Sequence, residues 1–379
     1  MAPVAMHTLE DNHEWIRRNM PRTRAACERM PDMSGVRLAY SGHIEPKMAD
    51  VLVAARRRGA EVFAISCNPT TVRDGVIAYL QEHGVGTHAW AGMSERDYRE
   101  SIAAALAWRP THTCEMGADL SLQAGDDHDI AIALEATGSG IARLADHPPA
   151  YPVFNWDDLP IKEGLHNRHM VGLSTWHTFM QRTWLSLHGK HVVVVGFGLV
   201  GEGVAEKARV FGAVVSVVDT DPGKRMQASY AGWNTGSLLE LAPSADVLVT
   251  ATGVAGAIDA RVLRALKPGC FLLNVGHRAD EIELDALGAR TSIVPHVESC
   301  RIDGKELLLF AGGSMANLTA GFGDSLNAFD VTAATMAEGI AFIATAEPGD
   351  WRDGVHPLPR EIWLRALRAP DARGDRPCR

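Results

Sequence analysis

A glycine-rich turn directly after an apolar run constrains the fold of this chain more than any other feature. Residues 191–195 read HVVVV, the pattern of a strand that is buried on both faces of a sheet. The run leads into Gly196, Gly198 and Gly201, spaced as G-x-G-x-x-G, and then into a predicted helix at residues 202–211. A strand, this glycine spacing and a helix in that order are typical of a dinucleotide-binding unit.

Each glycine has a physical reason in such a turn. Gly196 permits the tight turn, Gly198 lets the backbone approach a pyrophosphate, and Gly201 allows the helix and strand to pack closely. The helix N-terminus offers N–H groups to phosphates. The next predicted strand, residues 214–218, ends at Asp219, whose carboxylate can bind ribose hydroxyls and would repel a 2′-phosphate. The pattern therefore predicts NAD rather than NADP as the cofactor.

Two further apolar runs fit the same unit. Residues 246–250 and 271–274 are predicted strands, which end at or next to Thr250, Thr252 and Asn274. Ligands of an open α/β sheet bind beyond the carboxyl ends of its strands, where these small and polar side chains lie. We therefore place these three residues in the predicted cofactor site.

The first half of the chain alternates predicted strands and helices. The strands are predicted at residues 35–40, 61–65 and 87–90, and the helices at residues 49–58, 72–83 and 96–107. Such alternation favours a parallel sheet covered on both faces. The proline-rich residues 145–165 are expected to form an ordered loop. Helices are expected at residues 174–186 and 327–345, the second suited to a domain or subunit interface.

These elements predict a two-domain α/β protein, in which a Rossmann NAD-binding domain is inserted into a substrate domain with a parallel α/β sheet. The substrate domain is expected at residues 1–172 and the NAD-binding domain at residues 173–325. The C-terminal segment, residues 326–379, is expected to return to the substrate domain. A length of 379 residues accommodates this arrangement.

Composition narrows the class of function. The formal net charge is −9 and no long basic run occurs, which argues against nucleic-acid binding. No apolar stretch is long enough to span a membrane, and the N-terminal residues lack a signal-peptide pattern. The scattered cysteines indicate neither disulfides nor a zinc framework. His166 and His169 could share a helical face, but no further ligand has matching spacing, so no metal site is predicted. We expect a cytoplasmic enzyme that acts on a small molecule.

Several motifs, taken in order, carry a family resemblance. They occupy residues 42–43, 59–68, 119–120, 162–167, 196–203, 219–222, 252–253, 274–277 and 317–318. The chain is similar to S-adenosyl-L-homocysteine hydrolases (adenosylhomocysteinases) through most of residues 35–345. The resemblance implies a tightly held NAD used as a catalyst. The substrate 3′-hydroxyl is oxidised, the C4′ proton is removed, homocysteine is eliminated, water is added, and the ketone is reduced back.

The resemblance also implies roles for individual residues in this reaction. Lys162 would assist removal of the 3′-hydroxyl proton, and Asn167 would help to place the ribose and the nicotinamide. His43 and His277 would face the C5′ side, where elimination and water addition occur. Such a reaction requires a base near the 3′-oxygen, an acid/base group near C4′ and C5′, and exclusion of water at the ketone stage.

For the cofactor, the resemblance implies that Asn317, Thr250 and Thr252 line the nicotinamide half of the site. Asp219 takes the adenosine-ribose position, where the family more usually has glutamate, and Thr137 lies in the family's threonine run and joins the cofactor-binding set. The family is oligomeric, so a homo-oligomer, dimer or tetramer, is implied. The C-terminal Lys and Tyr motif that reaches a neighbour's cofactor in the family is missing here.

Several substrate-pocket positions depart from the family pattern. The family's acid/base aspartate falls on Met116, with Glu115 beside it, and a second family carboxylate falls on Ala136, with Glu135 beside it. We therefore treat Glu115 and Glu135 as candidate catalytic residues that compensate for the missing carboxylates. His166, in the place of an aspartate that contacts the substrate ribose, is a further candidate catalytic residue.

Two more departures concern the same pocket. The family's Gly-His-Pro-Ser turn reads Gly-Asp-Ser-Leu at residues 323–326, and Glu45 and Lys47 replace hydroxyl and acidic contacts to the purine. Because the dinucleotide motif is intact, this clustering indicates an altered nucleoside substrate. Three functions stay open: an adenosylhomocysteinase-like hydrolase, a divergent NAD-dependent oxidoreductase or lyase of specialised metabolism, and a catalytically silent NAD-binding regulator.

Overall fold

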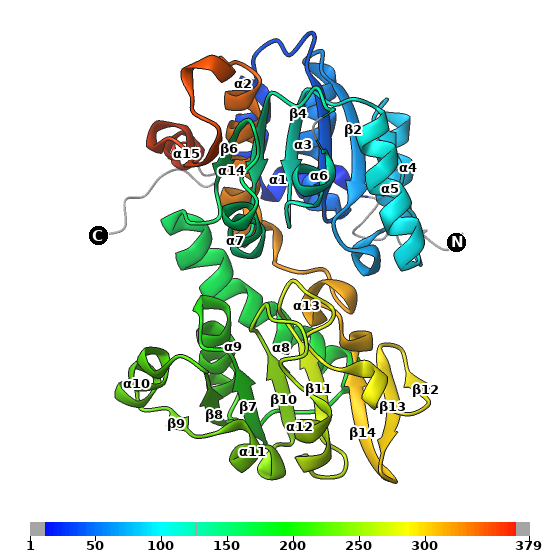
Figure 1. Cartoon of the computed structure of the whole chain (residues 1–379), viewed down its shortest axis with the longest axis vertical. Coiled ribbons are helices and arrows are strands. Elements are labelled where there is room, and N and C mark those ends of the chain that lie inside the picture. The colour runs from blue at the N-terminus through cyan, green and yellow to red at the C-terminus, as the bar shows by residue number, and fades with distance from the viewer. Residues whose placement is uncertain (1–11, 126, 369–379) are drawn as a thin grey trace, which may run out of the picture. The chain divides into compact units, whose positions relative to one another are not determined.

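The computed structural model describes residues 12–125 and 127–368, which form two compact units (Figure 1). The first unit contains the described residues of Met1–Lys162 and Leu326–Arg379, and the second contains Glu163–Ser325. The chain thus leaves the first unit and later returns to it. The second unit begins before residue 173, the boundary expected from the sequence, because the π-helical segment Lys162–Met170 continues directly into α8 (Val171–Thr183).

A parallel sheet forms the centre of the first unit. Its strands follow the order β15-β6-β5-β4-β1-β2-β3, and each neighbouring pair is parallel. The strand order reverses at β1, so the segments that follow β1 and β4 meet at the carboxyl edge of the sheet. The strands are β1 (Arg37–Gly42), β2 (Glu61–Ser66), β3 (Gly86–Thr87), β4 (His112–Glu115), β5 (Ile132–Glu135), β6 (Pro152–Asn155) and β15 (Gly354–Pro357).

Helices pack around this sheet. They are α1 (His13–Asn19), α2 (Pro21–Arg29), α3 (Pro46–Arg57), α4 (Asp74–Glu82), α5 (Glu95–Ala107), α6 (Asp119–Gln123), α7 (Gly138–Asp146), α14 (Leu326–Ile343) and α15 (Arg360–Leu367). The predicted helices and strands of the first half are present with end shifts of a few residues. Residues 145–165 were expected to form a loop, but they contain β6, which lies between β5 and β15. Pro152 is tolerated there because it is the first residue of the strand.

The long helix α14 packs inside the first unit. Its residues Phe329, Met336 and Ile340 are buried in the same apolar core as Leu38 of β1. The side chain of Asp330 accepts a hydrogen bond from the backbone N–H of Thr23 in α2 at 2.8 Å. The small and apolar residues of α14, which suggested a domain or subunit interface, are therefore covered largely by the first unit's own helices. No helix in residues 12–125 or 127–368 is long and apolar enough to cross a membrane.

The second unit is a doubly wound sheet with an antiparallel extension. Its strands follow the order β12-β13-β14-β11-β10-β7-β8-β9, and β12, β13 and β14 pair antiparallel. The strands are β7 (His191–Val195), β8 (Val214–Val218), β9 (Asn234–Thr235), β10 (Val247–Thr250), β11 (Phe271–Asn274), β12 (Thr291–Val294), β13 (Val297–Ile302) and β14 (Lys305–Phe310). The helices are α8, α9 (Leu199–Val210), α10 (Pro222–Tyr230), α11 (Leu238–Leu241), α12 (Ala260–Ala265) and α13 (Ala316–Thr319). The strand order reverses between β7 and β10, where a doubly wound sheet binds its ligand.

Candidate functional site

The turn from β7 to α9 has the geometry that a dinucleotide site requires. Gly196 has a φ of +94°, and a Cβ there would lie 2.7 Å from the carbonyl oxygen of Ala251. At Gly201 a Cβ would lie 1.9 Å from the carbonyl oxygen of Gly196, so helix and turn pack too closely for any side chain. At Gly198 a Cβ would meet no atom of the chain within 4 Å. Packing within the protein therefore does not require glycine at 198, whereas close approach of a phosphate does.

Asp219 organises the same turn. One carboxylate oxygen accepts a hydrogen bond from the backbone N–H of Phe197 at 2.7 Å, and the other accepts one from Asp221 at 2.8 Å. The side chain follows β8 and stays partly exposed. Asp219 thus fixes the shape of the glycine turn, and each carboxylate oxygen keeps a lone pair for a ribose hydroxyl.

The loop after β10 is held by a buried acid that sequence reasoning missed. The Glu281 carboxylate is fully buried and accepts hydrogen bonds from the Thr250 and Thr252 hydroxyls and from the backbone N–H groups of Thr252 and Gly253. Both threonines therefore lie at the switch point, as expected, but their hydroxyls donate hydrogen bonds to Glu281 and so hold the loop in place. Nothing in the spacing around Glu281 marks it, because its partners are distant in sequence.

Two asparagines lie beside this loop. Asn274 accepts a hydrogen bond from the backbone N–H of Gly276 at 2.7 Å and donates one to the carbonyl of Gly313 at 3.0 Å, which shapes the turn that carries the half-buried His277. Asn317 donates to the hydroxyl of Ser174 at 3.4 Å. Within the described part of the chain its buried Oδ1 atom has no hydrogen-bond partner. A buried acceptor without a donor fits a ligand amide such as the nicotinamide carboxamide.

Lys162 is held in place at the start of the π-helical segment. It is only 9 % exposed, and its ammonium group forms an ion pair with the Asp157 carboxylate. The same group lies 5.9 Å from the centre of the Trp156 ring. A lysine on a solvated loop would be exposed, so this environment sets Lys162 apart from an ordinary surface lysine.

The same segment carries the predicted residues His166 and Asn167, which are both half-buried. Hydrogen bonds from residue i to i+5 bring positions four or five apart to one side of a helix, so both follow Lys162 by one turn. The Nδ1 atom of His166 lies 2.5 Å from a carboxylate oxygen of Asp324. The motif analysis noted Asp324 only as part of a departure from the family in the substrate pocket and gave it no role.

His43 directly follows β1, at the switch point of the first unit. It is 8 % exposed, and its Nδ1 atom lies 3.0 Å from the Thr71 hydroxyl. The Cys67 sulfur lies 3.6 Å from the same nitrogen. Burial raises the pKa of the Cys67 thiol well above its usual value, so that thiol is protonated and is no nucleophile.

Glu115 and Glu135, at the ends of β4 and β5, are both fully engaged by the protein. Glu135 accepts hydrogen bonds from the backbone N–H groups of Gly117 and Ala118 at 2.9 Å and from Thr137. Glu115 accepts from the backbone N–H of Leu120 at 2.8 Å, and from the N–H and hydroxyl of Ser121. Burial raises the pKa of both carboxyl groups. These contacts favour a structural role, and the catalytic role of both residues stays a prediction.

The positions next to these acids carry no ionisable group. Met116 and Ala136 are buried at 7 % and 1 % exposure, directly after β4 and β5. Thr137 caps α7, where its hydroxyl accepts the backbone N–H of Gly140 at 2.9 Å. The carboxyl edge of this sheet therefore presents His43 and Met116 where the family resemblance leads one to expect a histidine and an aspartate.

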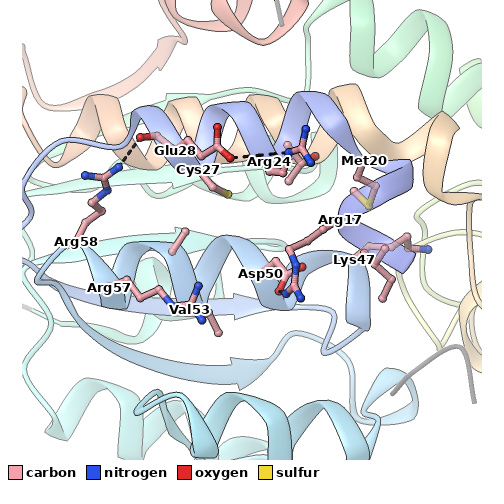
Figure 2. A pocket seen from close by; sticks show the side chains of 13 residues that line it. Arg17, Met20, Arg24, Cys27, Glu28, Lys47, Asp50, Val53, Arg57 and Arg58 are labelled. Atoms are coloured by element: carbon pink, nitrogen blue, oxygen red, sulfur yellow. Dashed lines mark hydrogen bonds and ion pairs between the residues drawn. The ribbon is translucent and has the colours of Figure 1, made fainter. Parts of the chain in front are cut away.

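The first unit contains a cavity of about 450 Å³ (Figure 2). Arg17, Arg24, Arg57 and Arg58 surround it, and Cys27 contributes to its apolar lining. Arg17 is paired with Asp50, and Arg24 with Glu28. None of the predicted catalytic or cofactor-binding residues lines this cavity.

Fold and geometry define the class of protein: a two-unit α/β enzyme with a dinucleotide-binding domain. Comparison with known families gives the same class. The "S-adenosyl-L-homocysteine hydrolase, NAD binding domain" family matches residues 170–323, and the "S-adenosyl-L-homocysteine hydrolase" family matches residues 16–149. The chain belongs to the S-adenosyl-L-homocysteine hydrolase family, and it is an NAD-dependent enzyme of that family. The predicted family, cofactor and two-domain α/β fold are confirmed.

Individual relatives agree over nearly the whole chain. An adenosylhomocysteinase of Pyrococcus abyssi is 34 % identical over 96 % of this chain and 89 % of its own length. An S-inosyl-L-homocysteine hydrolase of Methanopyrus kandleri is 33 % identical over 93 % of this chain and 87 % of its own length. An adenosylhomocysteinase of Thermococcus kodakarensis is 33 % identical over 93 % of this chain and 88 % of its own length. Similar relatives thus carry names with two different nucleosides.

Proposed function

We propose that this enzyme hydrolyses a nucleoside thioether, S-adenosylhomocysteine or an analogue such as S-inosylhomocysteine, by transient oxidation of the 3′-hydroxyl. Bound NAD would supply the hydride acceptor for that oxidation. The residues that would hold it are the glycines of the β7–α9 turn, Asp219 and Asn317. The open space at Gly198 and the buried acceptor of Asn317 fit this cofactor.

The observation that carries the proposal is the environment of Lys162. A buried ammonium group beside the substrate's 3′-oxygen lowers the pKa of that hydroxyl, because it stabilises the negative charge that develops on the oxygen. Asp157 keeps the Lys162 side chain in one position, so little reorganisation is needed when the substrate binds. Lys162 would thereby assist removal of the 3′-hydroxyl proton.

Two histidines would act on the other side of the sugar. Once C3′ is a ketone, the C4′ proton is acidic and the thiolate can leave from C5′ by elimination. His43 is held by Thr71, and His277 lies on the turn shaped by Asn274. Both would contact the C5′ side, where a proton must move during elimination and addition of water.

The test is release of free thiol from S-adenosylhomocysteine and from S-inosylhomocysteine by the NAD-loaded protein. We expect catalytic release from at least one of them, and a loss of about 10²-fold or more in Lys162→Ala. Lys267→Ala is the matched control, because Lys267 also pairs with an aspartate, at 2.8 Å, but lies far along the chain in the other unit. Equal activity of Lys162→Ala and Lys267→Ala would remove Lys162 from the mechanism.

A second candidate function follows from Met116 and Ala136. Because neither side chain can transfer a proton, an oxidoreductase or lyase that stops after oxidation or elimination on a different nucleoside is the alternative. That enzyme would release no thiol from either homocysteine thioether. Incubation with a panel of nucleosides would instead leave NADH on the protein or yield an unsaturated product.

A further inference from the structure

The cavity of the first unit lies between facing sides of the helices α2 and α3 (Figure 2). Its lining residues recur every three or four positions, as at Arg24 and Cys27 on α2 and at Asp50, Val53 and Arg57 on α3. Residues at this spacing share one face of a helix. The two faces leave about 450 Å³ between them, a volume that accommodates a small organic molecule.

The floor of this cavity is apolar. Met20 and Val53 line it, and both belong to the hydrophobic core of the first unit with only 2 % of their surface exposed. Cys27 contributes to the same floor. Burial raises the pKa of the Cys27 thiol to about 12, so the thiol is uncharged at neutral pH and acts as a small apolar group. The floor therefore suits the hydrocarbon part of a ligand.

The charges around the cavity are mainly positive. Five of its lining residues are arginine or lysine and two are glutamate or aspartate, although the whole chain has a formal net charge of −9. Three of the five cations face a carboxylate of the protein, in the pairs Arg17 with Asp50, Arg24 with Glu28, and Lys47 with Glu45. The excess positive charge therefore comes from the other two cations, Arg57 and Arg58.

Arg57 and Arg58 lie together at one end of the cavity, and Arg17 and Lys47 lie at the other (Figure 2). Arg58 donates a hydrogen bond to the backbone carbonyl of Glu28, which carries no charge. Within residues 12–125 and 127–368, neither Arg57 nor Arg58 forms an ion pair with a carboxylate. A guanidinium group binds a carboxylate or a phosphate through two parallel hydrogen bonds. The Glu28 side chain also lines the cavity, so a singly charged carboxylate is repelled less there than a doubly charged phosphate.

We propose that this cavity is a binding site for a small organic carboxylate with an apolar body. The carboxylate accepts hydrogen bonds from Arg57 and Arg58, and the body lies over Val53 and Cys27. The rise of α3 is about 1.5 Å per residue, so the stretch from Lys47 to Arg57 spans about 15 Å, which is long enough for the extended chain of octanoate. None of the predicted catalytic or cofactor-binding residues lines the cavity, so the inference does not depend on the proposed function.

The first test varies the head group of the ligand and keeps its chain. Calorimetry would titrate the full-length, NAD-loaded protein with octanoate, octanol and octyl phosphate. Octanoate should bind at one site and about tenfold more tightly than octanol, because only its head group forms charge-assisted hydrogen bonds with the arginines. Absence of octanoate binding, or equally tight binding of octanol, would overturn the site. Tighter binding of octyl phosphate than of octanoate would contradict the carboxylate as the head group.

The second test removes the charge at the head group. Arg57→Gln should weaken octanoate binding about tenfold and leave octanol binding unchanged. Arg56→Gln is the matched control, because Arg56 is the preceding arginine on α3 but donates a hydrogen bond to the carbonyl of Gly84 at 3.0 Å and does not line the cavity. It should bind octanoate like the unchanged protein. An equal loss in both variants would show a general effect of net charge and contradict the inference.

The third test fills the space proposed for the apolar body. Ala54 lines the cavity and is partly buried, and leucine is a good helix former, so Ala54→Leu should fold. Thermal unfolding and NAD binding check that it does. The variant should bind both octanoate and octanol about tenfold more weakly, because the added side chain occupies the floor. Unchanged octanoate binding by folded Ala54→Leu would show that the ligand binds elsewhere and overturn the inference.

Discussion

The two units carry their predicted site residues in different ways. In the second unit, the turn after β7 has no room for a side chain at Gly201 and open space at Gly198. In the first unit, the predicted carboxylates Glu115 and Glu135 are buried and bound by backbone N–H groups. The cofactor turn is thus defined by the shape of the backbone, which sequence spacing specifies. The substrate side depends on where individual side chains point, which spacing alone does not specify.

Substitutions at two glycines test most strongly whether backbone shape defines the cofactor turn. Gly201→Ala should lower the free energy of unfolding by about 3 kcal/mol and abolish NAD binding, because its Cβ would lie 1.9 Å from a carbonyl oxygen. Gly198→Ala should change stability by less than about 1 kcal/mol, since its Cβ meets no atom of the chain. It should nevertheless raise the Kd for NAD at least tenfold, or about 1.4 kcal/mol. Thermal unfolding measures the stability of each variant, and calorimetry measures its Kd for NAD. Normal NAD binding by Gly198→Ala would contradict the claim that backbone shape defines the cofactor turn.

The part played by side chains in the first unit is tested by replacing one carboxyl oxygen of Glu135 with an amide NH₂ group. Glu135→Gln should lower the free energy of unfolding by about 2 kcal/mol, because an amide NH₂ group would face backbone N–H donors. Denaturant unfolding measures the effect. Glu61→Gln, at a 59 % exposed side chain paired with Arg37, is the control and should cost less than about 1 kcal/mol. If Glu135→Gln is as stable as that control, the carboxylate is not structural.

The smallest expected effect concerns Asp219. Asp219→Ala should raise the Kd for NAD about tenfold, because a charge-assisted contact to the ribose is lost together with two hydrogen bonds to the turn. The fold should persist, since the side chain is partly exposed. Titration of the cofactor-free protein with NAD checks this. An unchanged Kd would refute the ribose role and leave Asp219 as a support of the turn only.

The shape of the glycine turn and its flanking strands could be predicted because local sequence determines it. The glycines, the buried valine strand and the acid after β8 lie within one strand–helix–strand segment, so their spacing fixes their geometry. Glu281 was missed because it reaches Thr250 and Thr252 from a different loop. The strand β6 was missed because its prolines suggested a loop, although an initial proline is compatible with a strand.

The substrate side was harder to predict because its chemistry depends on long-range partners. Sequence proximity made Glu115 and Glu135 candidates for the role of the missing carboxylates, and only the fold shows that backbone N–H groups of the following turns donate hydrogen bonds to both. His166 is a candidate because of its motif position, whereas Asp324, which it contacts, lies far along the chain and was noted only as a departure from the family. Sequence spacing identifies candidate site positions, and only the fold shows which of their side chains already have hydrogen-bond partners within the protein.

The most direct test of this account is the absorbance of bound NADH after the NAD-loaded protein is mixed with S-adenosylhomocysteine or S-inosylhomocysteine. The unchanged protein should show transient NADH with at least one of them, and Lys162→Ala should show almost none. Glu115→Gln, if folded, should still form NADH, because the Glu115 carboxylate already accepts hydrogen bonds from the N–H groups of Leu120 and Ser121. Loss of NADH formation in folded Glu115→Gln, with normal formation in Lys162→Ala, would contradict the account.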